Sequence, residues 1–319
     1  MNFKPIIVVS GEPYSIFLEI FFKIKKNKFK RPIIIIASKK LLLNQMKMLK
    51  FNFKVNLIDK KNINYRDLDN KKINVIDVHF KFSKTFDIIS DKSNEYIKEC
   101  FRIAIKLLKT NKYIGMINGP ISKKNFLKEE FLGITEYLAH KTKQKKFAML
   151  IYNKNLSVCP ITTHLPLKDV SKNITKSKII NQAKLIHSFY KKKFKKIPNI
   201  AITGLNPHCE SNYSSSEEKN IIIPSIEYLA KKKIKLDGPF AADTLFMKQG
   251  VKKYDVIIGM YHDQVLTPAK TLFEFKSFNI TLGLPFIRIS PDHGPNTLML
   301  GKNLSNPQSL LEALKFLDK

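Results

Sequence analysis

Short apolar runs alternate with longer segments of helical spacing along most of this chain. The runs at 5–10 (PIIVVS) and 31–38 (RPIIIIAS) are continuous rather than alternating, which is typical of strands buried on both faces. Residues 94–109 carry apolar side chains at helical spacing behind Ser93, which we expect to be the N-cap. The alternation predicts an α/β protein with a largely parallel sheet.

The same alternation continues to the C-terminus. We expect strands within 113–120, 147–164, 198–208 and 254–263, and helices at 172–190, 216–233 and 306–317. In the helix at 216–233, Glu217 and Glu218 would occupy the first turn, where acidic side chains are favourable. Most of the expected strands run into a glycine-containing turn. Ligands of open α/β sheets bind at the carboxyl ends of strands, so the chemistry should lie at these junctions.

Composition limits the class of protein. The 319 residues are 44% hydrophobic, enough for one large domain or two medium ones. No apolar stretch approaches the length of a membrane span, and the first apolar run lacks the features of a leader, so we expect a cytoplasmic protein without a membrane partner. Cys100, Cys159 and Cys209 are isolated from one another and are interpreted as small buried side chains.

The formal charge of +31 would suit a nucleic-acid partner. However, of the 57 basic residues only four are Arg, at positions 31, 66, 102 and 288. Arg is the side chain whose planar fork matches phosphate, whereas scattered Lys is typical of a solvated surface. We therefore expect a lysine-covered surface rather than a nucleic-acid interface.

Three strand-to-turn junctions carry a histidine: His164 in PITTHLPL, His208 in TGLNPHCE and His262 in GMYHDQ. One such histidine is more often structural, but three in equivalent places indicate a divalent-metal site with an open position. Asp243 and Asp263 are candidates to hold these imidazoles or to accept a proton, or are simply turn or N-cap residues.

Two cations are candidates for binding an anionic substrate. Arg288 lies in the apolar segment NITLGLPFIRIS, where a guanidinium needs an anionic partner, either an internal carboxylate or a substrate phosphate. Lys270, in TPAKTLFEF, is the second candidate.

Several long motifs together resemble the 4-hydroxythreonine-4-phosphate dehydrogenase family of pyridoxal phosphate biosynthesis. They follow that family's order and spacing, densely from about residue 113 to 301. The motifs are NGPISK, GITEYLA, TTHLPL, GLNPHCE, GPFAADTLF, MYHDQVLTPAK and NITLGLPFIRISPDHG.

The resemblance implies a two-lobed α/β/α fold like that of the isocitrate and isopropylmalate dehydrogenases, with the active site in the interlobe cleft at the interface of a homodimer. One lobe would comprise 1–137 plus 265–319, and 138–264 would form the central lobe with two metal-binding histidines and much of the dimer interface. The resemblance also implies NAD or NADP bound without a Rossmann fingerprint, and one divalent ion, which is Zn, Mg, Co or Mn. No GxGxxG occurs in this chain.

The resemblance further implies roles for individual residues. The metal ligands would be His164, His208 and, from the partner chain, His262. Substrate contacts would be Thr135, Lys270, Asn279 and Arg288, and Asp243, Asp263 and Lys270 would be catalytic. The reaction would oxidise the secondary alcohol of 4-phosphooxy-L-threonine to a 2-amino-3-oxo acid, which decarboxylates to 3-amino-2-oxopropyl phosphate.

The chain also departs from the family pattern. Ile134 stands where the family has a His before the Thr, and family glycines are missing after Gly11 and after Pro207. Three other functions remain open: a dehydrogenase of another phosphorylated hydroxy acid such as phospho-threonate or phospho-erythronate, a three-His metal hydrolase, and a non-enzymatic nucleic-acid binder.

Overall fold

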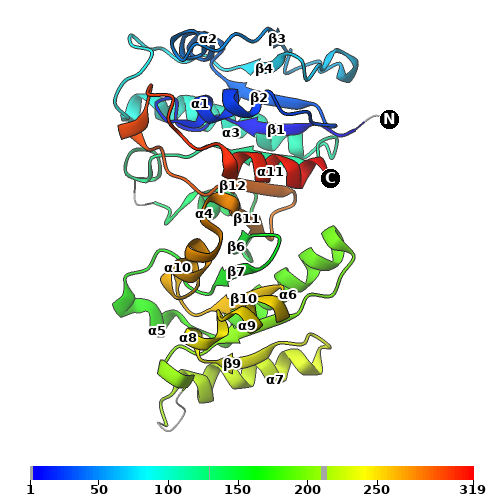
Figure 1. Ribbon diagram of the computed structural model, residues 1–319, viewed down its shortest axis with the longest axis vertical. Helices are drawn as coiled ribbons and strands as arrows, with labels where there is room; N and C mark the ends of the chain where they lie inside the picture. The colour runs from blue at the N-terminus through cyan, green and yellow to red at the C-terminus, as the bar shows by residue number, and fades with distance from the viewer. Residues whose placement is uncertain (1–2, 129, 210–213) are drawn as a thin grey trace. The chain divides into compact units, whose positions relative to one another are not determined.

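The computed structural model describes residues 3–128, 130–209 and 214–319, which divide into two compact units (Figure 1). Unit 1 consists of Met1–Tyr137 together with Pro285–Lys319, and unit 2 of Leu138–Leu284. In Figure 1 unit 1 contains the blue and cyan segments and the red C-terminal helix, whereas unit 2 is mainly green and yellow. Each unit combines strands and helices, as the alternating pattern predicts.

The strands of unit 1 follow one another in the order β3-β4-β2-β1-β5-β12, and every neighbouring pair is parallel. The central strands are continuous aliphatic runs because both of their faces are covered. Strand β1 lies between β2 and β5, so the sheet of unit 1 extends from β1 in both directions. Bounds are β1 Ile6–Val9, β2 Ile33–Ala37, β3 Val55–Leu57, β4 Ile73–Asp77, β5 Gly115–Asn118 and β12 Ile287–Pro291.

The helices of unit 1 are α1 (Phe17–Ile24), α2 (Lys39–Met48), α3 (Asn94–Leu108) and α11 (Gln308–Asp318). Helix α1 contacts both α2 and α11, whereas α3 packs against β1, β2 and β5. Helix α4 (Ile134–Lys141) contains the division between the units.

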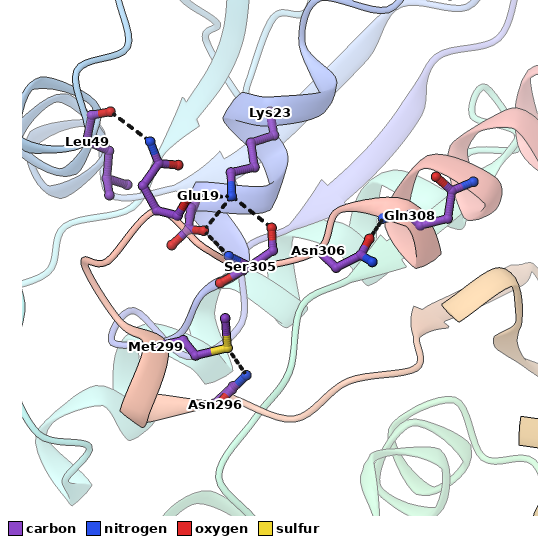
Figure 2. Close-up of polar contacts among 9 residues, drawn as sticks. Glu19, Lys23, Leu49, Asn296, Met299, Ser305, Asn306 and Gln308 are labelled. Atoms are coloured by element: carbon purple, nitrogen blue, oxygen red, sulfur yellow. Dashed lines mark hydrogen bonds and ion pairs between the residues drawn. The ribbon is translucent and has the colours of Figure 1, made fainter. Parts of the chain in front are cut away.

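A polar network fastens α1 to the segment that leads into α11 (Figure 2). The Lys23 ammonium donates to Glu19 Oε1 at 2.9 Å and to the Ser305 carbonyl at 2.8 Å, and Ser305 N–H donates to Glu19 Oε1 at 2.7 Å. Glu19 is buried, so its charge is neutralised by Lys23 in a setting where an isolated carboxylate would be costly. This contact joins the two separate chain segments that make up unit 1.

The strands of unit 2 follow the order β11-β6-β7-β10-β8-β9. Strands β7, β10, β8 and β9 are parallel, whereas β6 is antiparallel to both β7 and β11, so the expectation of a largely parallel sheet holds for one side of this unit. Bounds are β6 Ala148–Tyr152, β7 Ser157–Pro160, β8 Ile200–Thr203, β9 Asp237–Phe240, β10 Val256–Gly259 and β11 Phe278–Leu282.

Six α-helices lie wholly within the described part of unit 2. They are α5 Val170–Asn173, α6 Lys176–Phe194, α7 Ile223–Lys231, α8 Ala242–Leu245, α9 Lys248–Lys253 and α10 His262–Phe273. Helix α10 packs Val265 and Leu266 into the core beside β7 and β10. In Figure 1, α5, α8 and α10 lie at the left of unit 2, where they follow the ends of β7, β9 and β10.

Two expectations about local structure are corrected. Residues 265–284, which we assigned to the same lobe as the C-terminus, lie in unit 2 because α10 packs on β10 and β11 pairs with β6. Ser93 precedes α3, but its hydroxyl does not cap the helix; it donates to the Ser90 carbonyl and to Glu12 Oε2. Cys100 and Cys159 are buried as expected, whereas Cys209 is partly exposed.

Among the described residues, no helix combines the length and the apolar character needed to cross a membrane.

Candidate functional site

Three candidate metal ligands follow three neighbouring parallel strands of unit 2. His164 comes four residues after β7, His208 lies in the short turn Pro207–Cys209 after β8, and His262 is the first residue of α10 after β10. Strand β10 lies between β7 and β8, so the carboxyl ends of all three strands meet at one edge. The histidines therefore occupy the edge at which ligands of parallel sheets bind.

Two of these imidazoles lie close together within one chain. The ring centroids of His164 and His262 are 5.9 Å apart, and the rings are inclined at 39°. His262 Nδ1 is 2.6 Å from Asp263 Oδ1. Within residues 3–128, 130–209 and 214–319, no three His, Cys, Asp or Glu side chains form a group that could hold a metal ion, so His208 is not gathered with the other two.

The loop that carries His208 is held by a buried carboxylate that the sequence analysis interpreted differently. Glu218 Oε1 accepts hydrogen bonds from the N–H groups of Leu205 and Asn206 at 2.7 and 2.8 Å, and Glu218 Oε2 accepts from the Ser216 hydroxyl at 2.8 Å. Burial works to raise the pKa of Glu218, but these hydrogen bonds outweigh it and lower the pKa. The sequence pattern predicted only that Glu218 would be favourable in the first turn of a helix. In the structure, the Glu218 carboxylate also holds the loop that carries His208.

The two candidate aspartates differ in their surroundings. Asp263 is exposed apart from its contact with the His262 imidazole, so it can select the ring tautomer that leaves Nε2 available to a metal. Asp243 lies in α8. Burial raises the pKa of the Cys209 thiol, and the charges of Glu218 and Asp243 raise it further.

Unit 1 brings together two of the predicted substrate contacts, Thr135 and Arg288. Arg288, on β12, is fully buried; its Nε donates to Asn118 Oδ1 at 2.6 Å and its Nη1 donates to Thr135 Oγ1 at 3.5 Å. Burial lowers the pKa of Arg288 to about 9, and the Glu136 carboxylate opposes that shift. The guanidinium therefore stays charged at neutral pH and is held in a fixed orientation.

Asn118 and Glu136 belong to this cluster and were missed in the sequence. Burial raises the pKa of Glu136, although its own backbone N–H and the charges of Arg288 and Lys123 act to lower it. The signal was available, since Glu136 follows Thr135 in GITE and Asn118 ends the strand before GPISK. Ile134, the residue that departs from the family pattern, is the first residue of α4 and precedes Thr135 directly.

The remaining substrate candidates lie in unit 2. Lys270 is exposed on α10. Asn279 is half-buried on β11, and its side-chain Oδ1 is buried without a hydrogen-bond partner among the described residues. Leaving a buried acceptor unpaired is unfavourable, so this oxygen is suited to receive a hydrogen bond from a bound molecule.

The missing glycines of the first loop are explained by packing. Tyr14, Ile16 and Phe17, which stand in the family's glycine-rich stretch, are all buried in unit 1. A methyl group added at Gly119 would come within 2.6 Å of Phe17 Cγ, so no spare room is left between these two loops. Phe17, which stands where the family pattern has a glycine, therefore fills the space beside Gly119.

Comparisons with known proteins identify the family of this chain. A family model described as "Pyridoxal phosphate biosynthetic protein PdxA" matches residues 28–317. A 4-hydroxythreonine-4-phosphate dehydrogenase from Sulfurihydrogenibium sp. (strain YO3AOP1) is 38% identical over 97% of this chain and 95% of its own length. A protein of the same name from Aquifex aeolicus (strain VF5) is 34% identical over 99% of this chain and 98% of its own length.

Solved structures show the same relationship. The crystal structure of 4-hydroxythreonine-4-phosphate dehydrogenase from Klebsiella pneumoniae is 26% identical with a TM-score of 0.85, over 99% of this chain and 98% of that one. Isocitrate dehydrogenase from Methylococcus capsulatus, at 9% identity, shares the fold alone, with a TM-score of 0.51 over 99% of this chain and 85% of that one.

Proposed function

The chain belongs to the PdxA family of pyridoxal phosphate biosynthetic proteins, and we propose that it oxidises 4-phosphooxy-L-threonine with NAD or NADP and a divalent metal. The secondary alcohol becomes the ketone of a 2-amino-3-oxo acid, which loses CO₂ to give 3-amino-2-oxopropyl phosphate. The observation that carries the proposal is the full-length similarity, combined with histidines at the ends of three neighbouring parallel strands.

The donor set of unit 2 fits a divalent ion. Imidazole nitrogens suit Zn²⁺ or Co²⁺, whereas Mg²⁺ prefers oxygen ligands, so His164, His208 and His262 favour the first two. When bound, such an ion would lower the pKa of the substrate hydroxyl and balance the negative charge that develops on oxidation. Asp263 would orient His262, and Asp243, at the same edge, would accept the proton released from the hydroxyl.

The anionic groups of the substrate require cations. Arg288 offers a charged and rigidly held guanidinium, with Thr135 beside it, and Lys270 offers an exposed ammonium. Asn279 Oδ1 would accept a hydrogen bond from the substrate's hydroxyl or amino group. When bound, NAD or NADP would supply the nicotinamide that accepts hydride from the alcohol carbon.

The active form would be a homodimer in which His164 and His208 of one chain act with His262 of its partner. Exposed apolar side chains support a surface that a partner covers: Leu167, three residues after His164, is 72% exposed, and Met247 and Phe275, elsewhere in unit 2, are 61% and 57% exposed. Burying such side chains against a second chain is favourable. Within one chain, the ring centroids of His164 and His262 are 5.9 Å apart. A test of the dimer must therefore distinguish a site shared by two chains from a site in which both histidines come from the same chain.

Ile134 supports a second candidate substrate. An apolar side chain in place of the family's His removes a hydrogen-bond donor beside Thr135. A phosphorylated hydroxy acid that needs no donor at that position would be accommodated better, and phospho-threonate and phospho-erythronate are the candidates.

A turnover screen tests both candidates. The purified chain is incubated with 4-phosphooxy-L-threonine, phospho-threonate or phospho-erythronate, with NAD or NADP, and with or without Zn²⁺, Co²⁺, Mg²⁺ or Mn²⁺. We expect metal-dependent nicotinamide reduction with 4-phosphooxy-L-threonine. Reduction with only one of the other acids would establish the second candidate, and no reduction with any combination would overturn the proposed function.

A further inference from the structure

Gln264, two residues after His262, uses both ends of its side-chain amide. Its Oε1 accepts hydrogen bonds from the Thr203 hydroxyl at 2.8 Å and from the Met260 N–H at 2.7 Å. Its Nε2 donates to the Gly204 carbonyl at 2.8 Å. One side chain therefore contacts two main-chain groups and one side-chain hydroxyl, all within unit 2.

These partners lie on the two loops that carry His208 and His262. Thr203 ends β8 and Gly204 begins the loop to His208, whereas Met260 lies between β10 and His262. The β10–β8 pairing stops at Ile258 and Ile202. Beyond that point the amide of Gln264 takes over the connection between the two strand ends.

The local sequence makes room for this contact. A methyl group added at Gly259 would lie 2.3 Å from Val265 Cγ1 and 3.2 Å from Gln264 Oε1. Only a glycine at the end of β10 allows α10 to begin so close to the strand. The close approach brings the Gln264 amide within reach of β8.

The segment after β7, the third strand, is hydrogen-bonded to Gly259 and Met260 from the other side of β10. Ile161 N–H donates to the Gly259 carbonyl at 2.7 Å, and the Thr162 hydroxyl donates to the Met260 carbonyl at 2.8 Å. His164 follows two residues later. Met260 is thus held through its carbonyl by the His164 loop and through its N–H by Gln264, which continues to the His208 loop.

We propose that Gln264 is a positioning residue of the metal centre, because its amide ties the His208 loop to Met260, to which the His164 loop is also hydrogen-bonded. The inference rests on the proposed function, which makes these histidines ligands. An amide is required, since the site needs an acceptor for two donors and a donor for the Gly204 carbonyl. Met would fill the space without making these bonds, and an ionised Glu would place a carboxylate against a carbonyl.

The test compares metal affinity with folding stability in four single variants and in the double variant Gln264→Met/Thr203→Val. Gln264→Met removes the amide, Thr203→Val removes one hydroxyl with little change of shape, and Thr203→Ser keeps that hydroxyl. Gln45→Met is the matched control: Gln45 is a buried amide of unit 1 that donates to the Pro13 and Thr85 carbonyls at 3.1 and 3.2 Å. Co²⁺ affinity is measured by visible absorption and unfolding by circular dichroism.

We expect Gln264→Met to weaken Co²⁺ binding about 10-fold or more, in the range seen when support of a metal ligand is removed. Thr203→Val should weaken it less and Thr203→Ser should restore it. The double substitution should be no worse than Gln264→Met alone, because both remove the same link. Gln45→Met should lower the melting temperature and leave Co²⁺ affinity unchanged.

Unchanged Co²⁺ affinity in both Gln264→Met and Thr203→Val, with a lowered melting temperature as in Gln45→Met, would overturn the positioning role while leaving the metal centre intact. If Gln264→Met does not fold, Thr203→Val decides alone. Failure of the unsubstituted chain to bind Co²⁺ would overturn the metal centre and this inference together.

Discussion

The two units use the same kind of sheet edge in opposite ways. In unit 1 the carboxyl ends of β1 and β5 carry the buried polar residues Glu12 and Asn118, and the buried Arg288, near the start of β12, reaches Asn118 with its guanidinium. In unit 2 the ends of β7, β8 and β10 present imidazoles that are exposed or half-exposed. Burial therefore shifts the pKa values of Glu12 and Arg288 strongly. None of the three described histidines at the edge of unit 2 is buried.

This difference in burial indicates which kind of ligand each sheet edge is suited to bind. A buried guanidinium has lost its water and gains most from a matching anion, so unit 1 is suited to a phosphate or carboxylate. Accessible imidazoles can exchange water for a metal ion without unpacking the core, so unit 2 is suited to a cation. The predictions below test this division.

The largest effect is expected from the imidazoles of unit 2. His164→Ala or His208→Ala should lower kcat/KM by more than about 100-fold, beyond the effect of removing a group that only supports a ligand. Co²⁺ binding should fall in parallel, as measured by visible absorption. His187→Ala, a histidine within α6, is the control and should change neither quantity.

Mixed dimers sharpen this prediction. Equal amounts of His262→Ala and His164→Ala chains, unfolded and refolded together, should regain about a quarter of the activity if each site combines two chains, because one intact site forms in each heterodimer. No recovery would mean that His164 and His262 of a single chain serve one site.

In unit 1 the largest effect should appear in stability. Burial raises the pKa of Glu12 from 4.5 to about 7, against hydrogen bonds from the Ser93 hydroxyl and Tyr14 N–H that lower it. The folded state keeps the proton that the unfolded state has released, so stability falls as pH rises from about 4.5 to about 7. The free energy of unfolding should drop by up to about 3 kcal/mol across this window.

Glu12→Gln should remove that part of the pH dependence, as measured by urea unfolding at several pH values. Glu95→Gln, an exposed acid on α3, is the control and should retain it. Equal pH dependence in Glu12→Gln and the unsubstituted chain would show that Glu12 does not hold its proton.

Arg288→Lys tests the anion-binding role of unit 1. Lys keeps the charge but loses the planar fork that contacts Asn118 and Thr135, and a lost hydrogen bond to a charged group costs roughly 1.5–3 kcal/mol. KM for the phosphorylated substrate should rise about 10- to 100-fold. Arg102→Lys, on the surface of α3, should leave KM unchanged. A lowered melting temperature with an unchanged KM would instead indicate a structural Arg288.

The smallest effect is expected from Ile134→His. If the chain uses 4-phosphooxy-L-threonine, the added donor beside Thr135 should raise kcat/KM by about 10-fold. If its substrate is another acid, activity with that acid should fall and activity with 4-phosphooxy-L-threonine should stay negligible. Unchanged kinetics with every substrate would place Ile134 outside the site.

The sequence determined much of this protein by itself. Continuous aliphatic runs such as 5–10 and 31–38 became β1 and β2, because runs apolar on every face can be satisfied only inside a sheet. The three histidines were found because each follows such a run. The motifs from 113 to 301 indicated the family that the comparisons show.

Only the tertiary structure decided which residues support the site. Glu218 reaches back to the His208 loop, Ser93 gives its hydroxyl to Glu12, and Gln264 joins β8 to β10. Each contact depends on which strands become neighbours, and β10 enters between β7 and β8 although it follows both in the chain. Periodicity reports how a residue relates to its own element, whereas these hydrogen bonds link elements up to 81 residues apart, so their partners exist only once the sheet is assembled.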